Sequence, residues 1–382
     1  MNKRKIIFFS TSRADFYLLS LILQKFKKSK KFKSYLVATG NHYEKDKGQT
    51  YKEILKKGLK IDYKVPYNLK NGSQKEILYE ISKSIKKNFS ILNKIKPDLI
   101  LILGDRFELI SIANTSHLLD IPIVHLHGGE VTEGAFDDSI RHSITKLSNI
   151  HFVCHKTYKK RLINMGEDPK NIYDVGGIGA ELISHEKRLN KKDIEKKLNI
   201  KINKKIILVN LHPETKNKNI NYFSLFSALK KVNKNNMIIF TSPNSDPGST
   251  TISRFISKFK KNNNVYYFSN LGSELYFSLL RFSSVLIGNS SSGLLEAPIL
   301  NTPSINLGRR QKGRLLEKSV LNCNFNKNEI LKKINIMLNK RNTKFKIKYH
   351  INKEASKIIL KTLSKIDLKK IKVKRFYDVK SK

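Results

Sequence analysis

The chain of 382 residues exceeds the roughly 100–200 residues of a single ordinary domain, so we expect two domains. Its 39% hydrophobic and 9% aromatic content is enough to fill two cores, which excludes a wholly disordered chain. The formal net charge of +44 resides mainly in lysines spread along the sequence, and no arginine-rich module with interleaved aromatic residues is present. We therefore expect a solvated lysine surface and no nucleic-acid partner.

The apolar runs are too short for a membrane protein. The longest clear run, 99–103, is far below the roughly 18 residues that a membrane-spanning helix requires. The apolar run 6–9 near the N-terminus is shorter than a secretory core and indicates a first strand. Two cysteines, Cys154 and Cys323, cannot form a disulfide framework or a four-cysteine zinc site. We expect a cytoplasmic protein without a membrane partner.

Short apolar runs alternate with longer amphipathic segments, a pattern typical of parallel strands covered by helices. In the first half, this pattern predicts strands at 5–10, 34–39, 98–103, 121–126, 150–154 and 172–175, and helices at 16–27, 73–95, 107–118 and 138–147. A lysine-rich helix is predicted near 191–198. The second half repeats the pattern, with strands at 205–210, 237–241, 265–268, 284–287 and 304–307, and helices at 222–232, 250–260 and 273–281. Two further lysine-rich helices are predicted from about residue 324 onward.

Because the pattern occurs twice, the predicted fold is α/β, with two Rossmann-like doubly wound domains and a cleft between them. Three glycines within 176–179 indicate the hinge. We expect an N-terminal domain over 1–176, a C-terminal domain over 177–360, and a helix and tail over 361–382 that pack back on the N-terminal domain.

In doubly wound sheets, ligands bind beyond the carboxyl ends of the strands, so residues that directly follow strands are the candidates. Ser12 and Arg13 follow the first strand and suit an anion at a helix N-terminus, although an ordinary cap by Ser12 explains them equally well. Asp105 and Arg106 follow a strongly apolar strand, and a functional role is favoured over a capping aspartate paired with arginine.

The stretch 123–142 is unusually rich in titratable residues. His125 and His127 alternate on the predicted strand and are expected on the same side of it, and Glu130 follows a glycine pair. On the next helix, Asp138 is expected to share a face with His142, and Asp137 to share one with Arg141. A metal site is one interpretation, and proton transfer between carboxylates and imidazoles is the other.

The second half offers groups suited to a nucleotide diphosphate. His212 ends one strand, and a serine-rich loop follows another, where hydroxyl and N–H groups can cradle a diphosphate without a metal. Glu296 lies one turn beyond and is suited to ribose hydroxyls, while arginines after the last strand are suited to phosphate. The candidates in this half are Ser290, Ser291, Ser292, Glu296, Arg310 and Arg314. Neither a P-loop nor a dinucleotide-binding glycine motif is present, and we expect no metal and no cofactor.

Seven ordered motifs together resemble the hydrolysing UDP-N-acetylglucosamine 2-epimerases. The resemblance runs from the first strand to about Val320, and Phe376-Tyr377-Asp378 also fits the bacterial branch. It rests on Ser12-Arg13-Ala14-Asp15, Gly104-Asp105-Arg106, His127-Gly128-Gly129-Glu130, the stretch 137–146, His212-Pro213-Glu214-Thr215, the stretch 288–293 and Arg310-Gln311-Lys312-Gly313-Arg314.

The resemblance implies the glycosyltransferase-B arrangement and conversion of UDP-N-acetylglucosamine and water into N-acetylmannosamine and UDP, the first step towards sialic acids. By that resemblance, Asp105 and Asp137 are acid–base candidates, with Arg141 and His42 nearby. Residues implied to contact UDP are Arg13, Arg106, His212, Asn244, Ser290, Ser291, Glu296 and Arg310. His212 is also a catalytic candidate. A homodimer or homotetramer is the family expectation.

One position departs from part of the family, which has a carboxylate where this chain has His127. The proton carrier there is therefore open between His127 and the neighbouring Glu130. Two related reactions also remain open. One is the same hydrolysis on UDP-N,N'-diacetylbacillosamine, in the legionaminic acid pathway. The other is a non-hydrolysing 2-epimerisation, which is disfavoured because the stretch 137–142 resembles the hydrolysing branch. A glycosyltransferase of the same architecture is the alternative from another class.

Overall fold

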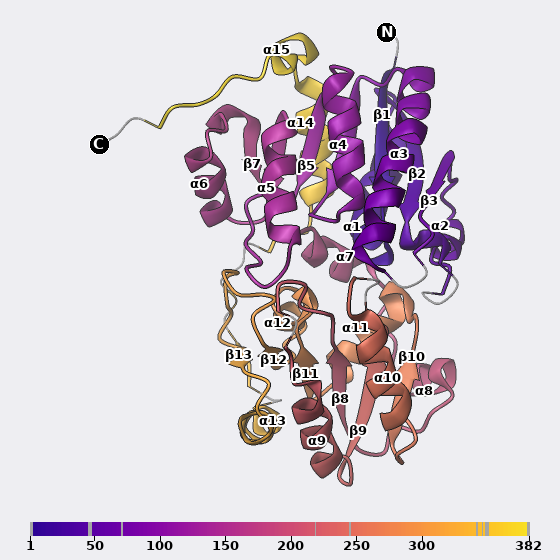
Figure 1. Ribbon diagram of the computed structural model, residues 1–382, viewed down its shortest axis with the longest axis vertical. Coiled ribbons are helices and arrows are strands. Elements are labelled where there is room, and N and C mark those ends of the chain that lie inside the picture. The colour runs from indigo at the N-terminus through magenta and orange to yellow at the C-terminus, as the bar shows by residue number, and fades with distance from the viewer. Residues whose placement is uncertain are drawn as a thin grey trace. The chain divides into compact units, whose positions relative to one another are not determined.

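The computed structural model describes residues 3–44, 48–69, 72–217, 219–243, 246–340, 343–345, 347 and 351–379. The chain divides into two compact units, each with its own parallel sheet (Figure 1). Unit 1 comprises Met1–Glu130, Asp137–Ser184 and Tyr349–Lys382, and unit 2 comprises Val131–Phe136 and His185–Lys348. In the part of the chain that the structure describes, no helix has the length and apolar character needed to cross a membrane.

Unit 1 is built on a seven-stranded sheet in the order β3-β2-β1-β4-β5-β6-β7. Every strand pair in it is parallel, and the central strands are apolar on both faces because helices cover both sides. The strands are β1 Arg4–Ser10, β2 Phe32–Gly40, β3 Tyr63–Pro66, β4 Leu99–Leu103, β5 Ile123–Leu126, β6 Ile150–Val153 and β7 Ile172–Asp174. The helices are α1 Arg13–Lys28, α2 Tyr51–Lys56, α3 Gln74–Ile95, α4 Glu108–Leu118, α5 Asp137–Leu147, α6 Lys156–Asn164, α7 Ile178–His185, α14 Ala355–Lys365 and α15 Leu368–Lys372, with 3-10 turns η1 Asn41–Tyr43 and η3 Pro169–Asn171.

Unit 2 repeats the design with a six-stranded parallel sheet in the order β10-β9-β8-β11-β12-β13. Its strands are β8 Lys205–Asn210, β9 Asn236–Thr241, β10 Val265–Phe268, β11 Val285–Gly288, β12 Ser304–Leu307 and β13 Val320–Cys323. Its helices are α8 Lys191–Leu198, α9 Tyr222–Val232, α10 Ser249–Phe259, α11 Gly272–Phe282, α12 Glu296–Ile299 and α13 Lys327–Asn339, with the 3-10 turn η4 Ser291–Gly293. The predicted fold class, two doubly wound α/β domains, is confirmed by these two sheets.

The described structure contains two strands, β3 and β13, that the sequence pattern did not predict. Both lie at the edge of their sheet, and each has exposed or half-buried residues within its four. An edge strand that is partly solvated lacks the continuous apolar run by which a buried strand is recognised.

The unit boundaries differ from the expected ones. Unit 1 extends to Ser184 rather than to residue 176, because α7 packs within it: Ile178 lies in its core, and buried Glu181 accepts a hydrogen bond from the backbone N–H of Ser356 at 2.7 Å. The chain returns to unit 1 at residue 349, earlier than residue 361.

The C-terminal return is a genuine part of the core of unit 1. Ala355, Ile359 and Leu363 recur at the four-residue spacing that places side chains on one face of a helix, and all three are buried in the same cluster as α1. Beyond α15, the backbone N–H of Tyr377 donates to the carbonyl of Gly166 at 3.0 Å. The yellow end of the chain thus belongs with the indigo and magenta elements of unit 1 (Figure 1).

Candidate active site

Polar side chains follow β1, β4 and β5 of unit 1, which are neighbours in the sheet. Because all strands are parallel, the residues that follow them gather at one edge, where doubly wound sheets bind ligands. The contacts of these residues distinguish side chains that stabilise the loops from side chains that are candidates for catalysis.

At the end of β1, the carboxylate of Asp15 occupies the N-terminus of α1. It accepts hydrogen bonds from the backbone N–H groups of Thr11 at 2.7 Å and Ser12 at 3.0 Å, and from the hydroxyl of Ser10 at 2.8 Å. Capping by the chain's own carboxylate therefore engages two of the N–H groups that the sequence suggested for an external anion. Arg13 is the first residue of α1, directly after this cap.

His42 is fully buried beside the same cap. Its Nε2 lies 2.9 Å from the hydroxyl of Ser10, and its Nδ1 lies 2.9 Å from the hydroxyl of Thr50. Burial lowers the pKa of His42 to about 4, although the carboxylate of Asp15 opposes the shift. The ring is therefore neutral at pH 7, and both its nitrogens are engaged by side-chain hydroxyl groups.

After β4, Arg106 pairs with Glu108. Its Nε lies 3.2 Å from Oε2 and its Nη2 lies 3.1 Å from Oε1 of that carboxylate, which is fully buried. The guanidinium group also stacks on the ring of Phe107 at 4.8 Å. A pair between Asp105 and Arg106 was the less favoured interpretation of this motif, and sequence reasoning gave Glu108 no role.

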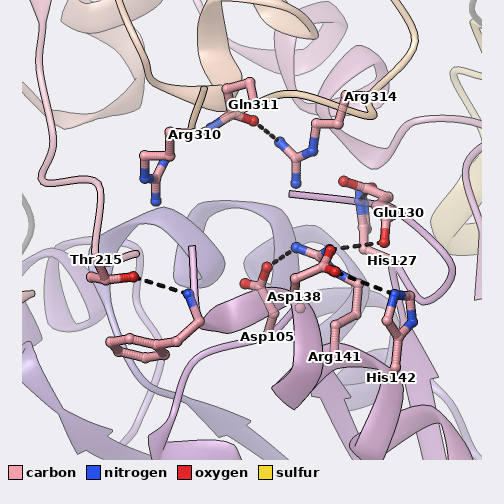
Figure 2. A network of polar contacts seen from close by, with 12 residues as sticks. Asp105, His127, Glu130, Asp138, Arg141, His142, Thr215, Arg310, Gln311 and Arg314 are labelled. Carbon is pink, nitrogen blue, oxygen red and sulfur yellow. Dashed lines mark hydrogen bonds and ion pairs between the residues drawn. The ribbon is translucent and has the colours of Figure 1, made fainter. Parts of the chain in front are cut away.

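Asp105 instead contacts Arg141, whose side chain is 1% exposed. Arg141 donates a hydrogen bond to this carboxylate and a second, of 2.8 Å, to the backbone carbonyl of Glu130, and its Nη1 lies 3.4 Å from Oδ1 of Asp138 (Figure 2). His142 Nε2 lies 3.8 Å from Asp138, as expected from their spacing on one helical face. One buried cation thus ties the loop after β4 to the loop after β5.

Asp137 is the first residue of α5 and is buried at 5% exposure. Carboxylates are favoured at this position because the helix dipole is positive there. Arg141 lies four residues further along the same helix, the spacing at which side chains share a face.

His127 and Glu130 form a buried pair at the end of β5. The Nδ1 atom of His127 lies 2.7 Å from Oε1 of Glu130, and the thiol of Cys154 lies 3.4 Å from the same oxygen. Nε2 of His127 is buried and has no hydrogen-bond partner among the residues that the structure describes. Sequence reasoning missed Cys154 because a lone cysteine after β6 carries no signal of its own.

His125 and His127 make separate hydrogen bonds at the end of β5. The strand ends at Leu126, and His127 has a left-handed backbone with φ of 63°. His125 Nε2 lies 2.8 Å from the carbonyl of Gly104, and burial lowers the pKa of His125 to about 3, which makes it a neutral support.

The metal interpretation therefore loses one of its imidazoles. A different trio, His127, Glu130 and Cys154, offers ligand atoms within 4.8 Å of one another. Hydrogen bonds among these three side chains account for their closeness without a metal ion.

In unit 2, the loops after β8 and β11 are held together by one side chain. Asn289 accepts the backbone N–H of His212 at 2.8 Å through Oδ1 and donates to the carbonyl of His212 at 2.9 Å through Nδ2. Gly288 has φ of 147°, and a Cβ there would lie 1.9 Å from the carbonyl oxygen of Asn210. This close approach explains why a glycine opens the serine-rich loop, residues 288–293, which we call the serine loop.

Within the serine loop, the hydroxyl of Ser292 lies 2.5 Å from that of Tyr276. Ser290 caps η4 by accepting the N–H of Ser292 at 3.4 Å. Local bonds thus engage two of the three hydroxyls that the sequence assigned to a diphosphate, while Ser291 begins η4 and Glu296 begins α12.

A second loop of unit 2, residues 308–314, carries the arginines and is called the arginine loop here. Oε1 of Glu214 accepts the backbone N–H groups of Arg309 at 2.7 Å and Arg310 at 3.1 Å. The side chain of Arg310 donates to the carbonyl of Asn289 at 3.1 Å, which brings it to the serine loop. Arg314 donates to Gln311 at 2.8 Å, as Figure 2 shows.

The structure therefore brings together the candidates of each unit separately. Asp105, His127, Glu130 and Arg141 lie in one network of unit 1, and Arg310 meets the serine loop in unit 2. Asn244 lies outside the residues that the structure describes. Sequence reasoning did not assign roles to Glu214 and Asn289, although both lie inside the motifs it quoted.

Both the sequence and the fold of this chain are similar to those of known proteins. A family model described as UDP-N-acetylglucosamine 2-epimerase matches residues 24–364. A Campylobacter jejuni protein named GDP/UDP-N,N'-diacetylbacillosamine 2-epimerase (hydrolyzing) is 40% identical over 85% of this chain and 86% of its own length. The polysialic acid biosynthesis protein P7 of Escherichia coli is 34% identical over 87% and 86% of the two chains.

A Legionella pneumophila protein named UDP-N,N'-diacetylbacillosamine 2-epimerase (hydrolyzing) is 32% identical over 94% of this chain and 96% of its own. Among solved structures, the UDP-GlcNAc 2-epimerase of Neisseria meningitidis bound to UDP-GlcNAc has a TM-score of 0.78 at 18% identity, over 95% of this chain and all of that one. The structural likeness extends the agreement in fold to nearly the whole chain. Since the family model and relatives above 30% identity each span most of the sequence, the chain belongs to the UDP-N-acetylglucosamine 2-epimerase family.

Proposed function

We propose that the protein hydrolyses a UDP-linked 2-acetamido sugar with inversion at C2, releasing UDP and the free epimerised sugar. The observation that carries this proposal is the buried network of Asp105, Arg141, Glu130 and His127 at the carboxyl edge of the unit 1 sheet. A reaction that removes a proton from one face of a sugar and returns one to the other face needs two proton carriers. This network supplies a carboxylate and an imidazole–carboxylate pair.

The proposed reaction has two stages in which every bond is accounted for. In the first, a protein base takes the proton from C2, the C2–H electron pair becomes the C1=C2 double bond, and the C1–O bond breaks with its electrons passing to UDP. In the second, a proton returns to C2 from the opposite face, and the oxygen of water bonds to C1 and loses a proton. The intermediate between the stages is a 2-acetamidoglucal, and one water is consumed.

C2–H is only weakly acidic because no carbonyl group adjoins it within the ring. Departure of the diphosphate must therefore be assisted, and the natural assistants are cations and N–H groups directed at the developing charge. In unit 2, we propose that Arg310, which contacts the serine loop, binds the diphosphate. Arg314, which also lies in the arginine loop, is proposed to assist it. We assign further nucleotide contacts to Arg13, Arg106, His212, Asn244, Ser290, Ser291, Ser292 and Glu296, with His42 as a support of the loop after β1.

Two carriers are proposed for the protons. One is His127, which Glu130 orients through Nδ1 so that the buried Nε2 remains for the sugar. The other is a carboxylate, Asp105 or Asp137. Arg141 bonds to Asp105 and to the backbone of Glu130, so it holds groups from both carriers in one network.

For the sugar, we propose UDP-N,N'-diacetylbacillosamine as the first candidate. The relatives at 40% and 32% identity both carry this sugar in their names. UDP-N-acetylglucosamine is the second candidate, favoured by the description of the family and by the relative named for polysialic acid biosynthesis. The word "hydrolyzing" in the two names supports release of UDP over a non-hydrolysing exchange.

The test is incubation of the purified protein with each UDP-sugar in D2O, followed by NMR. We expect free UDP, a reducing sugar epimerised at C2, and one deuterium at C2, because the returning proton comes from solvent. GDP-N,N'-diacetylbacillosamine serves as a third substrate. Asp105→Asn is the matched inactive variant, and no acceptor sugar is added.

Each alternative has its own result. Product that still carries UDP indicates a non-hydrolysing epimerase, and a requirement for an acceptor indicates a glycosyltransferase. Retention of the C2 proton in the product contradicts the elimination route. Preference between the two UDP-sugars is read from kcat/KM.

A further inference from the structure

The six residues Val131–Phe136, which we call the strap, belong to unit 2, whereas the residues on either side of them belong to unit 1. The strap is joined by peptide bonds to Glu130 at one end and to Asp137 at the other. In the proposed function, Glu130 orients the proton carrier His127 and Asp137 is a candidate proton carrier, so the contacts that hold the strap also affect the positions of these two residues.

The strap is anchored along the arginine loop. The backbone N–H of Glu133 donates to the carbonyl of Lys312 at 3.1 Å. A Cβ on Gly134 would lie 2.7 Å from the backbone of Arg309 and Arg310, so the backbone of the strap is in direct contact with the backbone of the arginine loop. At the start of the strap, Val131 occupies the space beside Gly313, where a Cβ would come within 2.3 Å of it.

The end of the strap is anchored to the segment that follows β8. The backbone N–H of Phe136 donates to the hydroxyl of Thr215 at 2.9 Å, a contact drawn in Figure 2. The N–H of Lys216 lies 3.3 Å from the carbonyl of Gly134. Glu214, one residue before Thr215, accepts two N–H groups of the arginine loop, so strap, loop and segment form one hydrogen-bonded junction.

We propose that the strap is a positioning segment. When the diphosphate binds to the arginine loop or leaves it, the strap transmits the change in the position of that loop to Glu130 and Asp137. Thr215 is the positioning residue, because it holds the peptide N–H directly before Asp137. Consecutive Cα atoms are a fixed ~3.8 Å apart, so a shift of Phe136 reaches Asp137 with almost no slack. The inference rests on the proposed function, in which Arg310 binds the diphosphate and Asp137 is a proton-transfer candidate.

The test compares Thr215→Val, which removes the hydroxyl acceptor at nearly constant shape, with Thr215→Ser, which keeps it. We expect Thr215→Val to lower kcat roughly 10- to 100-fold, the effect of displacing a reacting group by up to an ångström. Its affinity for UDP, measured by calorimetry, should stay within about threefold, which corresponds to less than the 1.4 kcal/mol of a tenfold change. Thr215→Ser should restore kcat.

A second readout separates positioning from a general loss of structure. Hydrogen exchange is followed in the peptide covering residues 137–147, with and without UDP. In the unaltered protein, UDP should slow exchange at the start of α5, and in Thr215→Val this response should be lost although UDP still binds.

Gly134→Ala is the second variant, because its methyl group meets backbone atoms that must shift. Its control is Gly177→Ala, where a Cβ would find nothing within 4 Å. The strap proposal is overturned by wild-type kcat in both Thr215→Val and Gly134→Ala, or by exchange at α5 that responds to UDP as before. If the unaltered protein binds UDP and cleaves the UDP-sugar in that case, the proposed function stands without the strap. If the unaltered protein does not bind UDP at all, the proposed function fails, and the strap proposal fails with it.

Discussion

The Nδ1 atom of His127 lies 2.7 Å from the carboxylate oxygen Oε1 of Glu130, and both side chains are buried. A carboxylate that accepts a hydrogen bond from Nδ1 leaves Nε2 as the acceptor of the neutral ring. His127 is thereby oriented in the way a general base requires, although its backbone lies outside the strand in a left-handed conformation.

Glu130→Gln removes the negative charge that orients His127. We expect kcat to fall by roughly 10²-fold, at the lower end of the range for groups that take part in proton transfer. UDP affinity should change less than kcat, because Glu130 acts on the reaction through His127, to which it is bonded at 2.7 Å. Steady-state kinetics and calorimetry measure the two quantities.

Its control is Glu133→Gln, three residues further along the chain. Glu133 forms an ion pair with Lys312 at 2.8 Å, but both side chains are about half exposed or more, so the pair contributes little. Equal losses of kcat in the two variants would contradict a special role for Glu130.

Asp105→Asn and Asp137→Asn should retain UDP binding and lose turnover by roughly 10²- to 10⁴-fold. Asp105→Asn should also lower the melting temperature, because Arg141 is 1% exposed and loses one of the carboxylates that compensate its charge. Detection of the 2-acetamidoglucal by NMR identifies the variant that still eliminates UDP but no longer returns the proton.

The matched surface variant is Asp120→Asn, whose carboxylate is 73% exposed and pairs with Lys372 at 3.0 Å. It should leave turnover and melting temperature unchanged. Loss of UDP affinity with intact turnover in either active-site variant would overturn the assigned roles.

Gly288→Ala should abolish UDP binding and destabilise unit 2. The added methyl group would lie 1.9 Å from the carbonyl oxygen of Asn210, at a φ that L-residues rarely adopt. Destabilisation by more than about 1 kcal/mol is expected for such an incompatible backbone. Denaturant unfolding and calorimetry with UDP check this, and Gly177→Ala should behave like the unaltered protein in both.

The stability of the protein should fall as the pH is lowered from about 6.5 to about 4, in part because of His42. Burial lowers the pKa of His42 to about 4 in the folded protein, whereas the unfolded chain takes up the proton near 6.5. The unfolded state therefore binds more protons within this window, and His42 alone contributes on the order of 3 kcal/mol of the loss. Urea unfolding at several pH values should give a shallower pH dependence for His42→Gln.

The stability of the protein should depend on Glu167 in a second, more acidic pH range. Burial opposes its charge, but the hydrogen bond from His151 and the ammonium groups of Lys374 and Lys146 outweigh burial and lower the pKa of Glu167 to about 2. Its contribution is complete above pH 4.5 and is lost as the pH falls towards 2. Glu167→Gln should cost about 3 kcal/mol at pH 7, because half-buried Lys374 loses its anion. Near pH 2 the variant and the unaltered protein should be equally stable in urea unfolding.

The sequence by itself determined the repeated α/β pattern, because buried parallel strands are continuous apolar runs that stand out from the amphipathic helices between them. The predicted helices at 191–198 and 222–232 coincide with α8 and α9, whereas the edge strands β3 and β13 were missed. It also placed the polar candidate residues directly after strands, the positions at which doubly wound sheets bind ligands.

Only the tertiary structure decided the partners of those residues. Arg106 pairs with Glu108, and Arg141 bonds to Asp105, which lies 36 positions away in the sequence. Spacing rules describe neighbours within one helix or strand, whereas the pair of Arg141 and Asp105 joins separate segments, and its geometry depends on how whole elements pack. The assignment of the strap to unit 2 has the same cause: six residues are too few for a pattern, and the backbone contacts that hold them come from loops more than 70 residues further along the chain.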